Sequence, residues 1–92
     1  MILFAFALAA AAMPATQRPL PPDVGRFIDK RDTCEHWIGE EGYDAARRRE
    51  IDRNVRRSCT GVDRELDRLR RVYRQNPRVL AALKDYYKVN LR

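Results

Sequence analysis

Apolar residues recur at helical spacing between residues 24 and 87, and no segment there alternates apolar and polar residues as a half-buried strand would. They form four groups: Val24, Phe27, Ile28, Cys34 and Ile38; Ile51, Val55 and Cys59; Val62, Leu66, Leu69 and Tyr73; Val79, Leu80, Leu83 and Tyr87. Steps of three and four residues place each group on one face of a helix. The pattern predicts an all-α fold, a small bundle of three to four helices whose short connections make neighbours antiparallel.

Helix start signals precede each apolar group. They are Asp23 for the first helix, Asp44 for the second, Thr60 with Asp63 as a capping box for the third, and Asn76-Pro77 for the fourth. In the last of these, Asn accepts free N–H groups and Pro at the first helical position has no N–H to leave unpaired. The signals predict a helical domain over residues 24–92.

The N-terminal stretch differs from this domain in composition. Residues 2–13 carry no charge and are apolar or small, but they are fewer than the roughly 20 residues that a membrane span needs. An apolar run followed by small residues is typical of a secretory signal. We therefore expect a signal peptide over residues 1–15, a Pro-rich leader over residues 16–23, a periplasmic or secreted location, and no transmembrane span in the mature chain.

The chain has two cysteines, Cys34 and Cys59. In an oxidising compartment two cysteines allow one intramolecular pairing. Both occupy core-facing positions of their expected helices, so we predict one disulfide that joins the first helix to the end of the second. Such a bridge is worth about 3–4 kcal/mol in the chain-entropy model, which is a large share of the stability of a domain this small.

The net charge is +6, and sixteen of the nineteen basic residues are Arg, concentrated between residues 47 and 78. One interpretation is a solvated surface with intrahelical ion pairs. The pairs at suitable spacing are Asp52/Arg56, Asp67/Arg71 and Glu65/Arg68. The other interpretation is a surface that binds an anionic partner, since Arg forms two-pronged hydrogen bonds to phosphate and carboxylate.

The stretch CEHWIGEEGYD, residues 34–44, contains residue types that active sites use, including the only His of the chain. However, Cys34 and His36 are spaced C-x-H, which is not a zinc-ligand spacing, and a disulfide would consume the thiol. We expect a structural hinge there, with no catalytic residues, no metal and no cofactor. Trp37 and Tyr43 are expected to cover the core or to anchor a partner.

Several of these residues together resemble a group of short, functionally uncharacterised bacterial secreted proteins. The shared pattern is C-x-H-[FW]-x-G-E…Y-D…C, followed by matching residues of the third and fourth helices: Cys34, His36, Trp37, Gly39, Glu40, Tyr43, Asp44, Arg47, Arg48, Cys59, Leu66, Leu69, Tyr73, Pro77 and Val79. The resemblance covers residues 31–83 and departs at Gly42, where the group tends to have Pro. It implies a secreted protein but brings no established activity.

We therefore expect a non-enzymatic, secreted or periplasmic binding module whose partner is an unknown protein or an anionic envelope component, and not nucleic acid. Trp37, Tyr43, Arg47 and Arg48 are the candidate partner-binding residues. Three alternatives stay open at this point. They are a basic nucleic-acid-binding protein of the cytoplasm, a small periplasmic protein similar to enzyme inhibitors in size and helix content, and a small hydrolase in which His36 meets Glu40 or Asp44 in a concave pocket.

Overall fold

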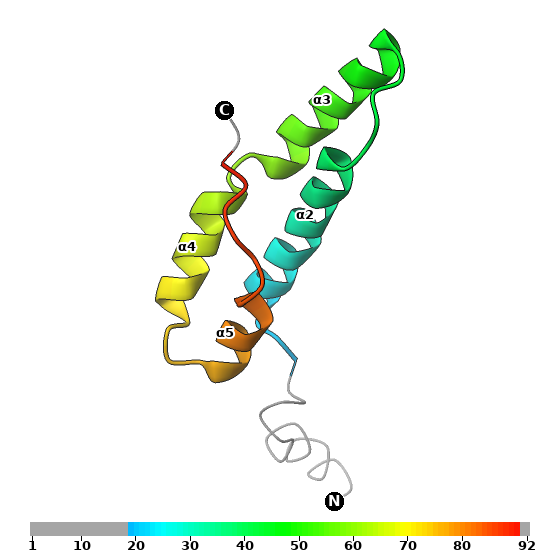
Figure 1. Cartoon of the computed structure of the whole chain (residues 1–92). Coiled ribbons are helices and arrows are strands. Elements are labelled where there is room, and N and C mark those ends of the chain that lie inside the picture. Colours follow the sequence, from blue (N-terminus) through cyan, green and yellow to red (C-terminus); the bar gives the residue numbers. More distant parts are fainter. Residues whose placement is uncertain (1–18, 91–92) are drawn as a thin grey trace, which may run out of the picture.

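The structure is a computed structural model that describes residues 19–90 (Figure 1). It is all-α, as predicted: four helices and, within the described range, no strand. The helices are α2 (Pro22–Ile38), α3 (Ala45–Cys59), α4 (Val62–Val72) and α5 (Pro77–Leu83). The predicted signal peptide and the first residues of the predicted leader lie outside the described residues.

The helices form a small bundle built on a helical hairpin. α2 and α3 lie side by side and run in opposite directions, while α4 packs on the other part of α2 and α5 packs on α4 (Figure 1). After α5 the chain continues without secondary structure and runs back along α4 toward the α3–α4 turn (Figure 1). We call residues 86–90 the strap.

Two of the four predicted caps are confirmed. The Asp44 carboxylate accepts the backbone N–H of Arg47 at 2.7 Å and begins α3. The Asn76 side chain accepts the N–H of Val79 at 3.1 Å and begins α5, with Pro77 as its first residue. In both cases a side-chain oxygen satisfies an N–H group that has no partner within the helix.

The other two cap predictions were wrong. α2 begins at Pro22, so Asp23 lies in the first turn, where its carboxylate accepts the Val24 N–H. α4 begins after Gly61, which has a φ of 84° and is the N-cap residue without a side-chain hydrogen bond. Asp63 does not close a capping box because its carboxylate binds the strap instead. The left-handed conformation at this one residue of the short connection between α3 and α4 favours glycine.

The core is a single cluster along the inner faces of the helices. Its fully buried apolar residues are Val24, Phe27, Cys34, Cys59, Val62, Leu66, Leu69, Val79 and Leu83. The predicted disulfide between Cys34 and Cys59 is present, with 4.8 Å between the two Cα atoms. It joins the last buried turn of α2 to the end of α3, directly before α4.

Three predicted core residues are exposed. Ile38 ends α2 at the hairpin and is 47 % exposed, because α4 and α5 lie at the opposite part of α2. Leu80 lies on the outer side of α5. Tyr87 is 68 % exposed because α5 ends at Leu83, so helical spacing no longer places Tyr87 on the buried face.

No helix within residues 19–90 is both long enough and apolar enough to cross a membrane.

Candidate functional site

The connection between α2 and α3 is closed by a polar cluster around Arg47. Its guanidinium contacts the Glu40 carboxylate at 3.0 Å and also pairs with Glu50 on its own helix. The guanidinium lies over the Trp37 ring, with 5.4 Å from Cζ to the ring centroid. The hydrogen bond to Glu50, and secondarily that to Glu40, raises the pKa of Arg47. These contacts join the end of α2 to the start of α3, which supports the hinge interpretation.

The four candidate partner-binding residues differ in how far they face the solvent. Trp37 and Arg47 are half-buried and contact each other, while Arg48 donates across the connection to the Gly42 carbonyl at 3.2 Å. Tyr43 is 76 % exposed. Trp37 and Arg47 therefore have a structural role in the hinge, and a role of these four residues in binding a partner stays a prediction.

His36 faces the solvent with its side chain 62 % exposed, and its Nε2 lies 3.1 Å from a Glu40 carboxylate oxygen. An imidazole–carboxylate pair can orient a base, but nucleophilic catalysis also needs a nucleophile within reach. The sulfur of Cys34 is bonded to Cys59, and Asp44 caps α3. No group of three or more His, Cys, Asp or Glu side chains within residues 19–90 is placed to hold a metal ion.

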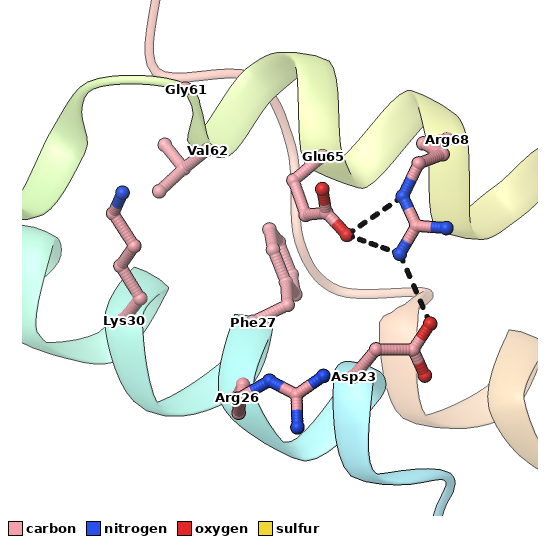
Figure 2. Close-up of a pocket in the computed structure, with 8 residues that line it drawn as sticks. All are labelled: Asp23, Arg26, Phe27, Lys30, Gly61, Val62, Glu65 and Arg68. Carbon is pink, nitrogen blue, oxygen red and sulfur yellow. Dashed lines mark hydrogen bonds and ion pairs between the residues drawn. The ribbon is translucent and has the colours of Figure 1, made fainter.

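A cavity of about 360 Å³ lies between α2 and the start of α4 (Figure 2). Arg68 crosses it and binds Asp23 at 3.0 Å and Glu65 at 2.6 Å. The hydrogen bonds that Arg68 donates to Glu65 and to Asp23 raise its pKa. Burial alone would raise the pKa of Asp23, but hydrogen bonds from Tyr73 and Arg68 outweigh it and lower that pKa. The charges at the cavity therefore fasten the first turn of α2 to α4.

Of the three predicted intrahelical ion pairs, only Glu65/Arg68 is present. Arg56 donates from Nε to the backbone carbonyl of Asp52 at 3.4 Å rather than to its carboxylate. Asp67 pairs with Lys88 of the strap at 3.0 Å, so it is not available to Arg71. A tertiary contact to Lys88 thus replaces the intrahelical pair with Arg71 that the spacing predicted for Asp67.

The outer face of α3 carries a row of unpaired arginines. Arg49, Arg53 and Arg57 are exposed and follow one another at intervals of four residues. None of the three has an ion pair or side-chain hydrogen bond to any residue in the range 19–90. At a rise of 1.5 Å per residue the row is about 12 Å long. We call these three residues the α3 arginine row.

The strap is fastened by a second polar cluster, on α2 and α4. Tyr86 donates its hydroxyl to Asp32 at 2.8 Å, and its ring meets Phe27 edge-to-face with 5.7 Å between centroids. Burial, followed by the hydrogen bond to Asp32, raises the pKa of Tyr86 from 10.0 to about 12. Sequence analysis did not find this cluster.

We expect alkaline pH to release the strap. A raised folded-state pKa means that the neutral form of Tyr86 stabilises the fold, fully below the unfolded value of 10.0, and that this contribution is lost as the pH rises through about 12. Tyrosinate absorbance should show a late component from Tyr86 and from Tyr73, because the hydrogen bond to Asp23 also raises the pKa of Tyr73. The late component should lose one tyrosine in Tyr86→Phe while that of Tyr73 stays, and an unchanged late component would contradict the assignment.

No protein-family model matches the chain, and neither a curated protein nor a solved structure was found to match it. The functional argument therefore depends on the geometry described above.

Proposed function

We propose that the chain is a non-enzymatic binding module of the cell envelope that attaches to an anionic lipid surface through the α3 arginine row. The observation that carries this proposal is that three arginines on one helix face have no acidic partner. Elsewhere in the described chain Arg47 and Arg68 are engaged by carboxylates, while Arg26, Arg64, Arg71 and Arg74 also lack a carboxylate partner but do not follow one another at intervals of four residues along one helix.

The position of the α3 arginine row on an exposed helix face is suited to a planar partner such as a membrane surface. Arg49, Arg53 and Arg57 stand along one side of a helix that packs on α2 by its opposite side. A convex helix face can reach the headgroups of a planar membrane surface without a cleft. Each cationic side chain near an anionic surface contributes roughly 1 kcal/mol, and the attraction falls off within a Debye length.

The expected compartment favours lipid over nucleic acid. The apolar N-terminal stretch is typical of an export signal, and the disulfide between Cys34 and Cys59 is typical of oxidising compartments. The same row would also attract the phosphates of a nucleic acid. None of the arginine row's neighbours on the outer face of α3 is an aromatic residue that could stack on bases.

The proposal is tested by two variants with the same net charge. Arg49, Arg53 and Arg57 are replaced by Gln in one, and the exposed Arg26, Arg71 and Arg74 are replaced by Gln in the other. Binding of each to vesicles with anionic lipid is measured by co-sedimentation, with neutral vesicles and duplex DNA as further arms. We expect the row variant to lose about 100-fold in affinity, at roughly 1 kcal/mol per arginine, and the control to stay within a few-fold of the wild type.

Equal losses in the two variants would mean that net charge alone drives binding, and this would contradict a specific face. Equal binding to neutral and anionic vesicles would overturn the proposal. Tighter binding to duplex DNA than to anionic vesicles at the same salt concentration would favour the nucleic-acid alternative.

A further inference from the structure

Side chains of α4 bind the backbone of the strap and of the last residue of α5 before it. The Arg70 guanidinium donates to the carbonyls of Leu83 at 3.1 Å and of Tyr86 at 2.6 Å. The Asp63 carboxylate accepts the N–H groups of Val89 at 2.7 Å and of Asn90 at 2.9 Å. Arg70 and Asp63, both on α4, therefore bind backbone carbonyl and N–H groups of the strap, and these contacts do not depend on the strap's side chains.

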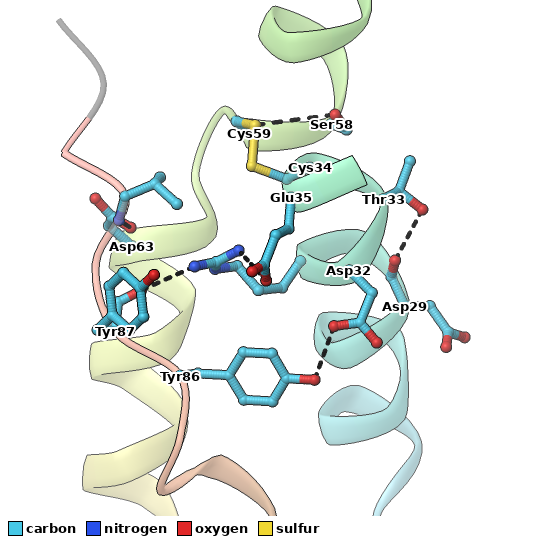
Figure 3. A network of polar contacts seen from close by, with 12 residues as sticks. Asp29, Asp32, Thr33, Cys34, Glu35, Ser58, Cys59, Asp63, Tyr86 and Tyr87 are labelled. Carbon is cyan, nitrogen blue, oxygen red and sulfur yellow. Dashed lines mark hydrogen bonds and ion pairs between the residues drawn. A yellow bond between two sulfur atoms is a disulfide. The ribbon is translucent and has the colours of Figure 1, made fainter. Parts of the chain in front are cut away.

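Side chains add the specificity. Tyr86 packs on Phe27, and its hydroxyl donates to Asp32, as Figure 3 shows. Lys88 pairs with Asp67, and Val89 packs on the edge of the core. Backbone contacts therefore hold the strap, and the contacts of Tyr86, Lys88 and Val89 depend on its sequence. We call Arg31, Asp32, Asp63, Asp67 and Arg70 the clamp.

The strap does not satisfy the clamp completely. Arg31 is buried to 3 % exposure, and its rather long contact to the Tyr87 carbonyl is 3.4 Å. Its Nε is buried without a hydrogen-bond partner in the described structure. Its guanidinium otherwise lies near the Tyr86 and Tyr87 rings and pairs with Glu35. A buried donor left unpaired costs free energy, so the docked strap leaves part of the hydrogen-bonding capacity of the clamp unused.

We propose that the clamp is an interaction site for an extended polypeptide segment, and that its partner is the strap of a second copy of this chain. Within one molecule the strap already binds the clamp through the contacts described above. Exchange needs only the exposed Lys84 and Asp85 to change conformation, because Leu83 before them is fully buried in α5. Two copies that trade identical segments form a closed, symmetric dimer at low cost.

The affinity of the exchange can be bounded. A short flexible linker gives a tethered segment an effective concentration on the order of millimolar. If the strap stays docked within its own molecule, the dissociation constant of a free strap from the clamp must be lower than this effective concentration, because otherwise the tethered strap would be mostly undocked. Association between two copies is therefore expected at submillimolar concentration once the internal competitor is removed.

The experiment uses two complementary variants of the full chain. The clamp variant, Asp63→Ala with Arg70→Ala, keeps an intact strap that its own clamp cannot hold. The strap variant, Tyr86→Ala with Val89→Pro, lacks the Tyr86 side chain and the Val89 N–H group that Asp63 accepts, so its intact clamp holds its own strap weakly. We expect neither variant to dimerise alone and a 1:1 mixture to form a heterodimer by sedimentation equilibrium.

Wild-type chain mixed with the strap variant is the matched control. Its strap is occupied internally, so the apparent affinity should be at least about 10-fold weaker than in the complementary mixture. Circular dichroism and an intact disulfide show whether each variant is folded. If a double variant does not fold, the single pair Arg70→Ala and Tyr86→Ala replaces it.

No heterodimer up to millimolar concentration would overturn the proposal. So would self-association of the clamp variant alone, because that would require another surface. A synthetic peptide of residues 84–90 that binds the strap variant while the whole clamp variant does not would also overturn the second copy as partner. That result would assign the clamp to free peptide segments.

Discussion

Replacing Cys34 and Cys59 together by alanine is expected to lower the free energy of unfolding by about 3–4 kcal/mol, as the chain-entropy model gives for a loop of this length. The bridge spans 25 residues of sequence. It also holds α3 against α2 at the point where α4 begins, and α3 packs chiefly on α2. Both cysteines are buried in the core cluster, so the variant loses packing as well as the cross-link.

Urea denaturation of oxidised wild type, reduced wild type and the double variant measures this effect. Reduced wild type serves as the control, because it loses the cross-link while keeping both side chains. We expect reduced wild type to lose stability through the missing cross-link, and the double variant to lose more because it also lacks the packing of both side chains. A loss below about 1 kcal/mol in both would mean that the unfolded chain is already compact around this loop and gains little entropy when the bridge is absent.

Leu66→Ala is expected to destabilise the fold by about 2–4 kcal/mol, the range for truncating a buried leucine. Leu66 is 1 % exposed and lies at the centre of the contact between α4 and the rest of the core. Leu69→Ala should have a similar effect because Leu69 is fully buried one turn later. Thermal or urea unfolding measures both.

Val72→Ala on the same helix is the matched control. Val72 is 56 % exposed, so its truncation should cost less than about 0.5 kcal/mol. Arg68 is a poor control despite its position on the outer part of α4, because it joins Asp23 to Glu65. Similar losses in Leu66→Ala and Val72→Ala would mean that α4 is rotated relative to the described core.

Local signals in the sequence were enough to predict the helices and most of the core. Asn76-Pro77 and Asp44 determine where α5 and α3 begin, because each cap is a contact between residues three apart. The apolar series of α4, from Val62 to Leu69, is buried as its spacing predicted. The disulfide also followed from residue type and helical phase. Such features depend on neighbours in the chain, which sequence patterns report directly.

Arg31 was the one available signal for the clamp, and sequence analysis missed it. It lies on α2 between Phe27 and Cys34 at core-facing spacing, where a charged residue is unusual. Its partner in the strap, Tyr87, is 56 residues away in the sequence. Helical periodicity continued past Leu83 and wrongly extended the last helix to Tyr87, because the strap is stabilised by α2 and α4 rather than by its own sequence.

The sequence by itself determined the fold class, the helix starts at Asp44 and Asn76, the buried face of α4 and the Cys34–Cys59 pairing. Only the tertiary structure decided which charges are engaged and which remain free. Asp67 turns to Lys88 and Asp63 to the strap amides, while Arg49 on α3 keeps no partner in the described chain. The physical reason is that a carboxylate can choose among all donors brought near it by folding, and spacing along one helix describes only the nearest of them.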